Sequence, residues 1–198
     1  MKNKLVIIGC GGHARSVADV YLFNNPDAEI VFVEENAKDG EEILGFPALK
    51  SYDIKNEKVF IAIGDNKARE SELKKHKTTE TIVSKKACIG KDVELGNGVF
   101  IAHEAHVGVG SKIGEGTIIN SSALVDHEVL IGKNCHIAPN STICGRCTIG
   151  KNTFVGAGAT IIDKLTISDN VTVGAGAVVI KNIDKPGTYV GNPARKIK

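Results

Sequence analysis

The stretch IGEGTIINSSALVDHEVLIGKNCHIAPNSTICGRCTIG, residues 113–150, carries an aliphatic side chain at every sixth position. Aliphatic residues occupy only roughly a quarter of positions by average usage, so chance does not produce such a run. A six-residue repeat predicts a β-solenoid, and Val83 would extend it by one hexad. The period covers sixteen consecutive positions: Ile89, Leu95, Ile101, Val107, Ile113, Ile119, Val125, Ile131, Ile137, Ile143, Ile149, Val155, Ile161, Ile167, Val173 and Val179.

Each hexad of such a solenoid supplies one short strand and one corner, and three hexads close a triangular coil. Residues n and n+18 then stack on the same face, and sixteen hexads make about five coils. The position two before each aliphatic residue is usually small or apolar, and it should face the interior. Cys135 and Cys147 occupy this position, which favours small interior side chains over a zinc or redox site shared with Cys144.

The composition divides the chain into two parts. Six of the 22 glycines lie in residues 1–83 and sixteen in 84–198, whereas six of the nine aromatic residues precede residue 84. We therefore expect two domains, 1–80 and 81–198, with the boundary near 78–85. The charges nearly cancel, at 25 Lys+Arg against 23 Asp+Glu, which argues against a nucleic-acid partner. The five cysteines, with no leader-like segment and no long apolar run, predict a cytoplasmic protein with free thiols and no membrane span.

The first part has a β-α-β order. Apolar strands are expected at residues 4–8, 30–33 and 59–63, with helices after the first glycine turn and near 67–75. Apolar strands in this order predict a parallel sheet with flanking helices. Gly9, Gly11 and Ala14 fit G-x-G-x-x-A, and Glu34 follows twenty residues later, as in dinucleotide-binding turns.

Small residues at such a turn let a phosphate approach the backbone N–H groups of a helix N-terminus. The first part is half the size of a full dinucleotide fold, which favours a mononucleotide or a nucleotide sugar. A turn without a ligand and an NAD-dependent oxidoreductase remain as alternatives.

Asp126, His127 and Glu128 are the clearest polar departure from the repeat. Val125 and Val129 should point inward, which leaves the three polar residues on an outer corner. The corners eighteen residues away are glycine-containing, which should leave room for a ligand. An acidic-His-acidic corner favours a functional site over a plain surface histidine. Other hypotheses remain open: a purely structural solenoid, and a zinc site of the γ-carbonic anhydrase kind built from His103, His106, His127 and His136.

Several motifs together resemble a known family. They are the GCGGH turn at 9–13, IAIGDN at 61–66, the corner from Asn120 to Glu128, and YVGNPAR at 189–195. The chain resembles bacterial sugar acyltransferases, which join an N-terminal Rossmann-like, nucleotide-sugar-binding βαβ domain to a left-handed hexapeptide-repeat β-helix. The left hand comes from this resemblance alone, because ordinary crossover rules favour right-handed connections.

The resemblance implies acetyl-CoA-dependent N-acetylation of the 4-amino group of a UDP-4-amino-4,6-dideoxy sugar. The alternative within the same class is O-acetylation of a sugar such as sialic acid. The resemblance also implies a homotrimer with its active site between subunits and no metal ion. A direct transfer, with backbone N–H groups near Gly145 stabilising the thioester oxyanion, is the expected mechanism.

The resemblance also implies individual roles. His127 corresponds to the general base, Glu128 to a carboxylate that assists it, and Asn120 to a residue near the reacting groups. The positions that contact acetyl-CoA are His136, Gly145, Ala157 and Ala175. The nucleotide-sugar pocket corresponds to Cys10, Gly11, Gly12, His13, Glu34, Glu35 and Gly64. Glu34 and Glu35 depart from the pattern, because the nearest relatives carry two aspartates there.

Overall fold

The computed structural model describes residues 4–76 and 79–198. Its N-terminal domain is a five-stranded sheet in the order β3-β4-β2-β1-β5, parallel except for the β3–β4 hairpin. The expected strands and helices are confirmed to within two residues at their ends, whereas the hairpin was not predicted. The elements are β1 (Lys4–Ile8), α1 (Gly12–Asn24), β2 (Glu29–Val33), β3 (Glu42–Ile43), β4 (Phe46–Leu49), β5 (Lys58–Ile61) and α2 (Asn66–Leu73).

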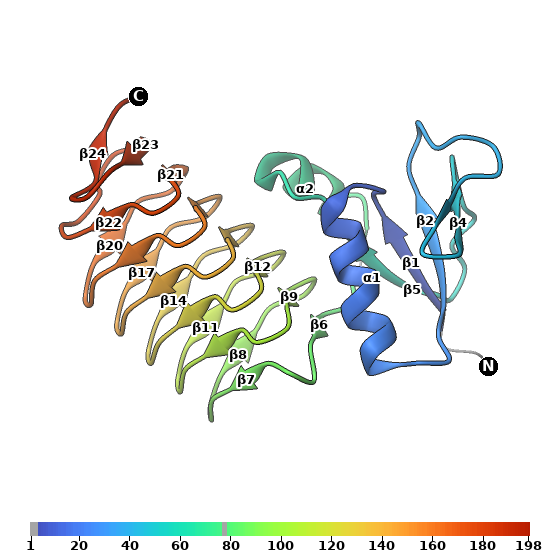
Figure 1. The fold of residues 1–198 in the computed structure, drawn as a ribbon, viewed down its shortest axis with the longest axis horizontal. Coiled ribbons are helices and arrows are strands. Elements are labelled where there is room, and N and C mark those ends of the chain that lie inside the picture. The colour runs from blue at the N-terminus through green and yellow to red at the C-terminus, as the bar shows by residue number, and fades with distance from the viewer. Residues whose placement is uncertain (1–3, 77–78) are drawn as a thin grey trace.

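The rest of the chain is a parallel β-solenoid with three faces (Figure 1). The covered face, which packs on the N-terminal domain, contains β6 (Ile82–Val83), β9 (Phe100–Ile101), β12 (Ile118–Ile119), β15 (His136–Ile137), β18 (Phe154–Val155) and β21 (Val171–Val173). The second face contains β7 (Cys88–Ile89), β10 (His106–Val107), β13 (Leu124–Val125), β16 (Thr142–Ile143), β19 (Thr160–Ile161) and β22 (Val178–Val179). The third face contains β8 (Glu94–Leu95), β11 (Lys112–Ile113), β14 (Leu130–Ile131), β17 (Thr148–Ile149) and β20 (Thr166–Ile167).

The register confirms the eighteen-residue coil. Val107 pairs with Val125, which pairs with Ile143, and the other rungs keep the same spacing. Strand β6 adds the extra hexad that Val83 suggested. At the far end, β23 (Gly187–Val190) continues the covered face and β24 (Arg195–Lys196) turns back against it. The boundary expected at 78–85 begins at residue 78, which lies outside the described residues.

Three corners join the faces, and each takes its name from the order of the chain. The first corner leads from the covered face to the second face and contains 102–104, 120–122, 138–140, 156–158 and 174–176. The second corner leads to the third face and contains 108–110, 126–128, 144–146 and 162–164. The third corner returns to the covered face and contains 114–116, 132–134, 150–152 and 168–170. A left-handed backbone recurs in these corners, for example at Glu128 (φ 56°) and Arg146 (φ 61°).

The solenoid interior is aliphatic but contains a set of small polar side chains at the inward positions two before the aliphatic residues, as the repeat predicted. Each donates to the carbonyl group fifteen residues later, at a corner of the next coil, as buried polar groups require. Cys135 and Cys147, which are fully buried as expected, make this contact through sulfur. We call these contacts corner clips; their donors are Thr81, Ser111, Thr117, Cys135, Cys147 and Thr153.

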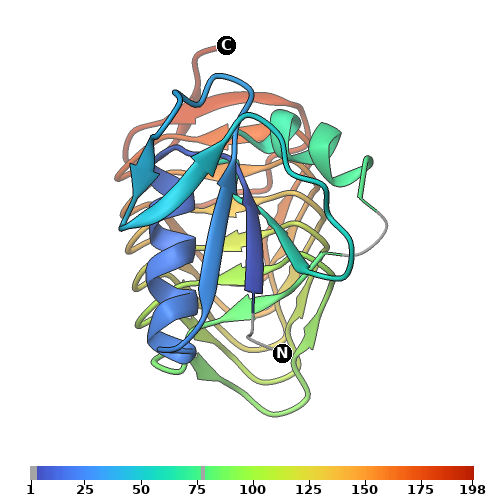
Figure 2. The ribbon, with the colours of Figure 1, turned by 90° about the vertical axis from the view of Figure 1, so that its right-hand side faces the viewer.

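The N-terminal domain lies against the covered face, with α1 along the first corner and α2 along the third (Figure 2). Arg69 of α2 is buried (1% exposed) and donates to six oxygen atoms. These belong to Asn66, to the backbone after β5 (Ile63 and Gly64), and to third-corner carbonyl groups of the solenoid and the adjoining Cys135. A single guanidinium group therefore ties the end of β5 to two coils.

A second contact joins the domains along the first corner. His103 contacts Asp19 of α1 through Nε2 (3.2 Å) and the Ser84 hydroxyl through Nδ1 (2.6 Å). Ser84 is buried, and its oxygen also accepts from the Lys86 N–H. The Ser–His–Asp chain therefore holds the two domains together and presents no accessible nucleophile.

Candidate active site

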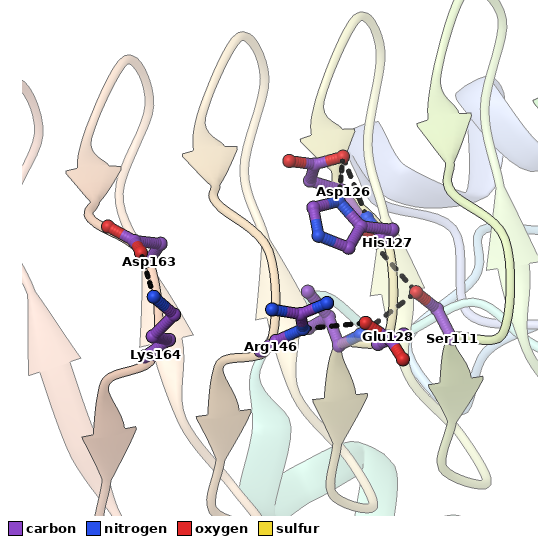
Figure 3. Close-up of polar contacts among 8 residues, drawn as sticks. Ser111, Asp126, His127, Glu128, Arg146, Asp163 and Lys164 are labelled. Atoms are coloured by element: carbon purple, nitrogen blue, oxygen red, sulfur yellow. Dashed lines mark hydrogen bonds and ion pairs between the residues drawn. The ribbon is translucent and has the colours of Figure 1, made fainter.

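His127 lies on the second corner, where the turn after β13 carries three polar side chains outward (Figure 3). Val125 and Val129 are fully buried, which confirms the predicted direction of the turn. Oδ1 of Asp126 accepts from the His127 backbone N–H (2.7 Å) and lies 2.9 Å from Nδ1 of the imidazole. A carboxylate can only accept, so Nδ1 carries the proton and Nε2 presents its lone pair to solvent.

Asp126 is the carboxylate that contacts the imidazole. Glu128, the expected partner, instead forms an ion pair with Arg146 of the next coil (Oε2 to Nε, 2.7 Å). The His127 contacts lower the pKa of Asp126, and the Arg146 hydrogen bond lowers the pKa of Glu128. Both groups are thus carboxylates at neutral pH, but only one of them orients the ring.

Gly145 lies directly against the His127 ring. A Cβ atom there would lie 2.4 Å from Cε1 and 2.6 Å from Nε2 of the imidazole. The room expected beside His127 is therefore filled by its own ring. The N–H of Arg146 donates to the His127 carbonyl (3.0 Å) and is therefore engaged within the corner. The oxyanion role expected for backbone N–H groups near Gly145 stays a prediction.

The carboxyl ends of β1, β2 and β5 form one edge of the N-terminal sheet, where ligands of open α/β sheets bind. Gly11 and Gly12 lie at the N-terminus of α1, where a Cβ atom on either residue would have no neighbouring atom within 4 Å. No side chain caps this end of the helix. Beside them lies a cleft of about 450 Å³ whose lining includes Glu34 and Glu35. Lys50, Tyr52, Lys75 and His76 also line this cleft, although the sequence pattern did not single them out.

Two histidines meet where the N-terminal domain touches the covered face. The rings of His13 and His136 have centroids 6.4 Å apart, and Asn120 Nδ2 lies 3.2 Å from His136 Nε2. His13 Nε2 and His136 Nδ1 are buried without a hydrogen-bond partner. Burial lowers the pKa of His13 to about 3, and the charges of His136 and Arg69 contribute to this shift. Burial and the charge of Arg69 lower the pKa of His136 to about 4. Both rings are neutral, and each keeps an unused nitrogen.

The remaining predicted residues lie partly on the solenoid and partly in the N-terminal domain. Ala157 and Ala175 are exposed on the first corner, the same edge as Asn120. Gly64 follows β5 and lines a second cleft of about 480 Å³ with Asn66, Asn152 and Phe154. Cys10 lies partly buried in the glycine turn. One chain therefore brings together His13, Asn120 and His136, but places His127, Glu128 and Gly145 on a different corner.

Two residues of this site were missed or misassigned by sequence reasoning. The position of Asp126 was predicted, but its contact with the ring depends on turn geometry that the repeat does not encode. Arg69 sits in a Lys- and Glu-rich segment, which indicates a solvated helix, and no local signal announces its burial. Within residues 4–76 and 79–198, no three His, Cys, Asp or Glu side chains converge as a metal site would require. The four solenoid histidines belong to the first corner, the second face, the second corner and the covered face.

No helix in the described part of the chain has the length and apolarity needed to cross a membrane. Two family models match the chain: the PglD N-terminal domain at residues 4–76, and the bacterial transferase hexapeptide (six repeats) at 110–145 and 146–181. No curated protein sequence matches the chain.

Solved structures match over nearly the full length. The acetyltransferase domain of PglB from Neisseria gonorrhoeae is 28% identical, with 99% of this chain and 100% of that chain covered and a TM-score of 0.92. The same domain has been solved with acetyl coenzyme A (28% identity, 100% of both chains, TM-score 0.93). A variant of GDP-perosamine N-acetyltransferase from Caulobacter crescentus, in complex with CoA and GDP-perosamine, is 30% identical (98% and 97% covered, TM-score 0.89).

An α/β domain docked on a left-handed hexapeptide solenoid, with a carboxylate-bound histidine on an open corner, defines an acyltransferase. The matched models and structures then fix the family. The chain belongs to the bacterial sugar acyltransferases that combine a PglD N-terminal domain with hexapeptide repeats.

Proposed function

We propose that the protein transfers an acetyl group from acetyl-CoA to the 4-amino group of a UDP-linked 4-amino-4,6-dideoxy sugar. The observation that carries the proposal is the Asp126–His127 pair, which leaves an imidazole nitrogen free on an exposed corner. The two N-acetyltransferase structures described above support acetyl-CoA and a nucleotide-linked amino sugar as substrates. Acetyl-CoA use and five free thiols favour the reducing cytoplasm as the setting.

In this mechanism the sugar amine attacks the thioester carbonyl carbon while His127 Nε2 takes the proton that the nitrogen loses. The tetrahedral intermediate collapses, the carbon–sulfur bond breaks, and the proton passes from His127 to the departing CoA thiolate. Asp126 holds the proton on Nδ1, which keeps Nε2 in its basic form and stabilises the imidazolium that forms. General-base catalysis of this kind contributes roughly 10²- to 10⁴-fold.

The nucleotide sugar is proposed to bind across the carboxyl edge of the N-terminal sheet. Its diphosphate would lie at the uncapped N-terminus of α1, where backbone N–H groups and the helix dipole favour an anion. The base would enter the cleft lined by Glu34, Glu35 and Lys75. The sugar would then extend toward His13 and His136, where the N-terminal domain meets the covered face.

Acceptor assays test this function. We expect turnover of UDP-linked 4-amino sugars with acetyl-CoA, and the panel includes GDP- and dTDP-linked forms and the matching 4-hydroxy sugars. Preference for another nucleotide would correct the UDP assignment alone. Activity confined to hydroxyl acceptors such as sialic acid would contradict N-acetylation.

The separation of the two half-sites favours a homotrimer. The second face connects the first corner to the second corner, so chains arranged with this face toward a threefold axis would bring His127 of one copy beside Asn120 and His136 of the next. The outward side chains of the second face suit such contact, since they include Leu124, Thr142 and Thr160. The third face instead carries the exposed Lys112–Glu94 ion pair (2.8 Å).

Complementation tests the shared site. His127→Ala and His13→Ala should each inactivate the homotrimer. Co-expressed, the two variants should regain about a quarter of the sites, because each shared site draws one half from either chain at random. Absence of any regained activity would place the whole site within one chain.

Matched leucines test the interface. Leu124 on the second face and Leu130 on the third are 39% and 44% exposed. Leu124→Asp should yield monomers of low activity, measured by light scattering, because it would bury a carboxylate at the interface. Leu130→Asp should remain trimeric, and dissociation by this variant instead would assign the interface to the third face.

A further inference from the structure

Ser111 lies beneath the turn that carries His127. Its side chain is fully buried, one coil earlier than the turn. The hydroxyl donates to the Asp126 carbonyl (2.8 Å) and accepts from the Val129 N–H (3.0 Å) (Figure 3). One hydroxyl group therefore holds both ends of the 126–129 turn, and His127 lies between these two contacts.

The other corner clips show what is particular about Ser111. The clips of Thr81, Thr117, Cys135 and Thr153 end at the third corner, where Arg69 and α2 dock. Two clips end at the second corner within the described residues. Cys147 donates to the Ile162 carbonyl through its thiol, whereas Ser111 donates to the Asp126 carbonyl through its hydroxyl. The stronger of the two second-corner clips thus supports the turn that carries the base.

Backbone contacts hold the same turn: the Glu128 N–H donates to the Val109 carbonyl of the preceding coil (2.8 Å), and the His127 carbonyl accepts from the Arg146 N–H (3.0 Å). Asp126 fixes the imidazole through Nδ1, and Gly145 limits it from the following coil. Ser111 adds the side-chain contacts to the turn from the preceding coil, at Asp126 and Val129. Proton transfer depends on sub-ångström placement of the base, so a small shift of the turn should reduce the rate without changing substrate binding.

We propose that Ser111 is a positioning residue for acetyl transfer, whose buried hydroxyl fixes the 126–129 turn so that His127 meets the reacting amine. The proposal rests on the proposed function, because it assumes that His127 is the base. Ser111 touches neither substrate, and its effect passes through the backbone of Asp126 and Val129.

Thr117 offers a matched control. It makes the same pair of contacts one corner further on, donating to the Gly132 carbonyl (2.9 Å) and accepting from the Cys135 N–H (3.1 Å). Ser111→Ala and Thr117→Val each delete one hydroxyl and should lower the unfolding temperature by similar amounts. Ser111→Ala should also lower kcat roughly 10- to 100-fold with KM for both substrates within about twofold, whereas Thr117→Val should keep kcat within about twofold.

Two further variants complete the test. Ser111→Cys should give an intermediate kcat, since a thiol already makes this clip at Cys135 and Cys147. It also keeps the proposal testable should Ser111→Ala not fold. In a His127→Ala background, Ser111→Ala should have no further effect on the residual rate, because the group that it positions is missing.

The outcomes separate the two hypotheses. Near-normal activity of His127→Ala would overturn the proposed base, whatever Ser111 does. An inactive His127→Ala together with equal kcat losses in Ser111→Ala and Thr117→Val would overturn the positioning role alone. Independent, additive effects of Ser111→Ala and His127→Ala would also overturn it.

Discussion

Two histidines nine residues apart in the solenoid have opposite environments. His127 stands on the second corner, 43% exposed in its side chain, with Nδ1 against Asp126. His136 lies under the N-terminal domain, where burial and the Arg69 charge lower its pKa to about 4. One has a carboxylate partner and a free nitrogen facing solvent, whereas the other is held neutral beside a buried cation.

The comparison shows how the fold sets the chemistry of one residue type. A base must gain a proton during the reaction, and a nearby carboxylate stabilises the resulting imidazolium. Burial and the Arg69 charge make His136 a weak base, but its neutral ring can hydrogen-bond to an uncharged acceptor group. The difference supports the proposed role of His127 in proton transfer and leaves His136 as a neutral hydrogen-bonding group.

The largest expected effect separates these two roles. His127→Ala should lower kcat roughly 10²- to 10⁴-fold, because the proposed general base is lost, while acetyl-CoA binding measured by calorimetry stays close to normal. His136→Ala should act mainly on KM. A kcat loss in His136→Ala that equals the loss in His127→Ala would erase the distinction.

The next effect is on stability in acid. His13 and His136 are neutral in the folded state, with pKa values of about 3 and 4, against an ordinary histidine value of 6.5. The unfolded chain therefore binds more protons below pH 6.5, and stability falls as the pH drops toward 4. His136 alone should contribute on the order of 3 kcal/mol to this loss.

Urea unfolding of the protein and of His136→Asn between pH 7.5 and about 4 measures this contribution. The difference between the two free energies of unfolding should be constant above pH 6.5 and should shift in favour of the variant below it. Parallel curves over the whole range would show that His136 is not held neutral by the fold.

The smallest effect concerns the room around the His127 ring. Gly145→Ala should displace the imidazole and lower kcat roughly tenfold, with little loss of stability, because a half-exposed ring can turn away. Gly108→Ala is the comparison: its Cβ would lie 2.6 Å from backbone atoms of Asp126 and His127, which cannot move aside. The temperature of thermal unfolding should therefore fall sharply for Gly108→Ala but not for Gly145→Ala. Equal unfolding temperatures of the two variants would contradict this explanation.

The hexad period predicted the solenoid, its inward positions and the outward corner at 126–128, because one aliphatic residue per strand leaves little freedom. It did not predict which carboxylate meets the imidazole. Asp126 and Glu128 flank His127 equally in sequence, and the left-handed backbone at Glu128 directs its side chain toward Arg146 instead. The β3–β4 hairpin was missed because its strands are short and Leu44 and Gly45 form the turn without a strong motif. The burial of Arg69 was not predicted, because a side chain that is buried by another domain does not follow the hydrophobic periodicity of its own helix.

The eighteen-residue coil has a consequence for how the length of this protein can change. Removing one hexad between His127 and Ala157 would rotate every later residue by one face and carry Ala157 to another edge. Removing or adding a whole coil would keep each later residue on its own face and alter only the height of the stack. Insertions and deletions in this region therefore preserve the alignment of these two corners only in steps of one coil, which makes the distance between His127 and Ala157 a discrete quantity.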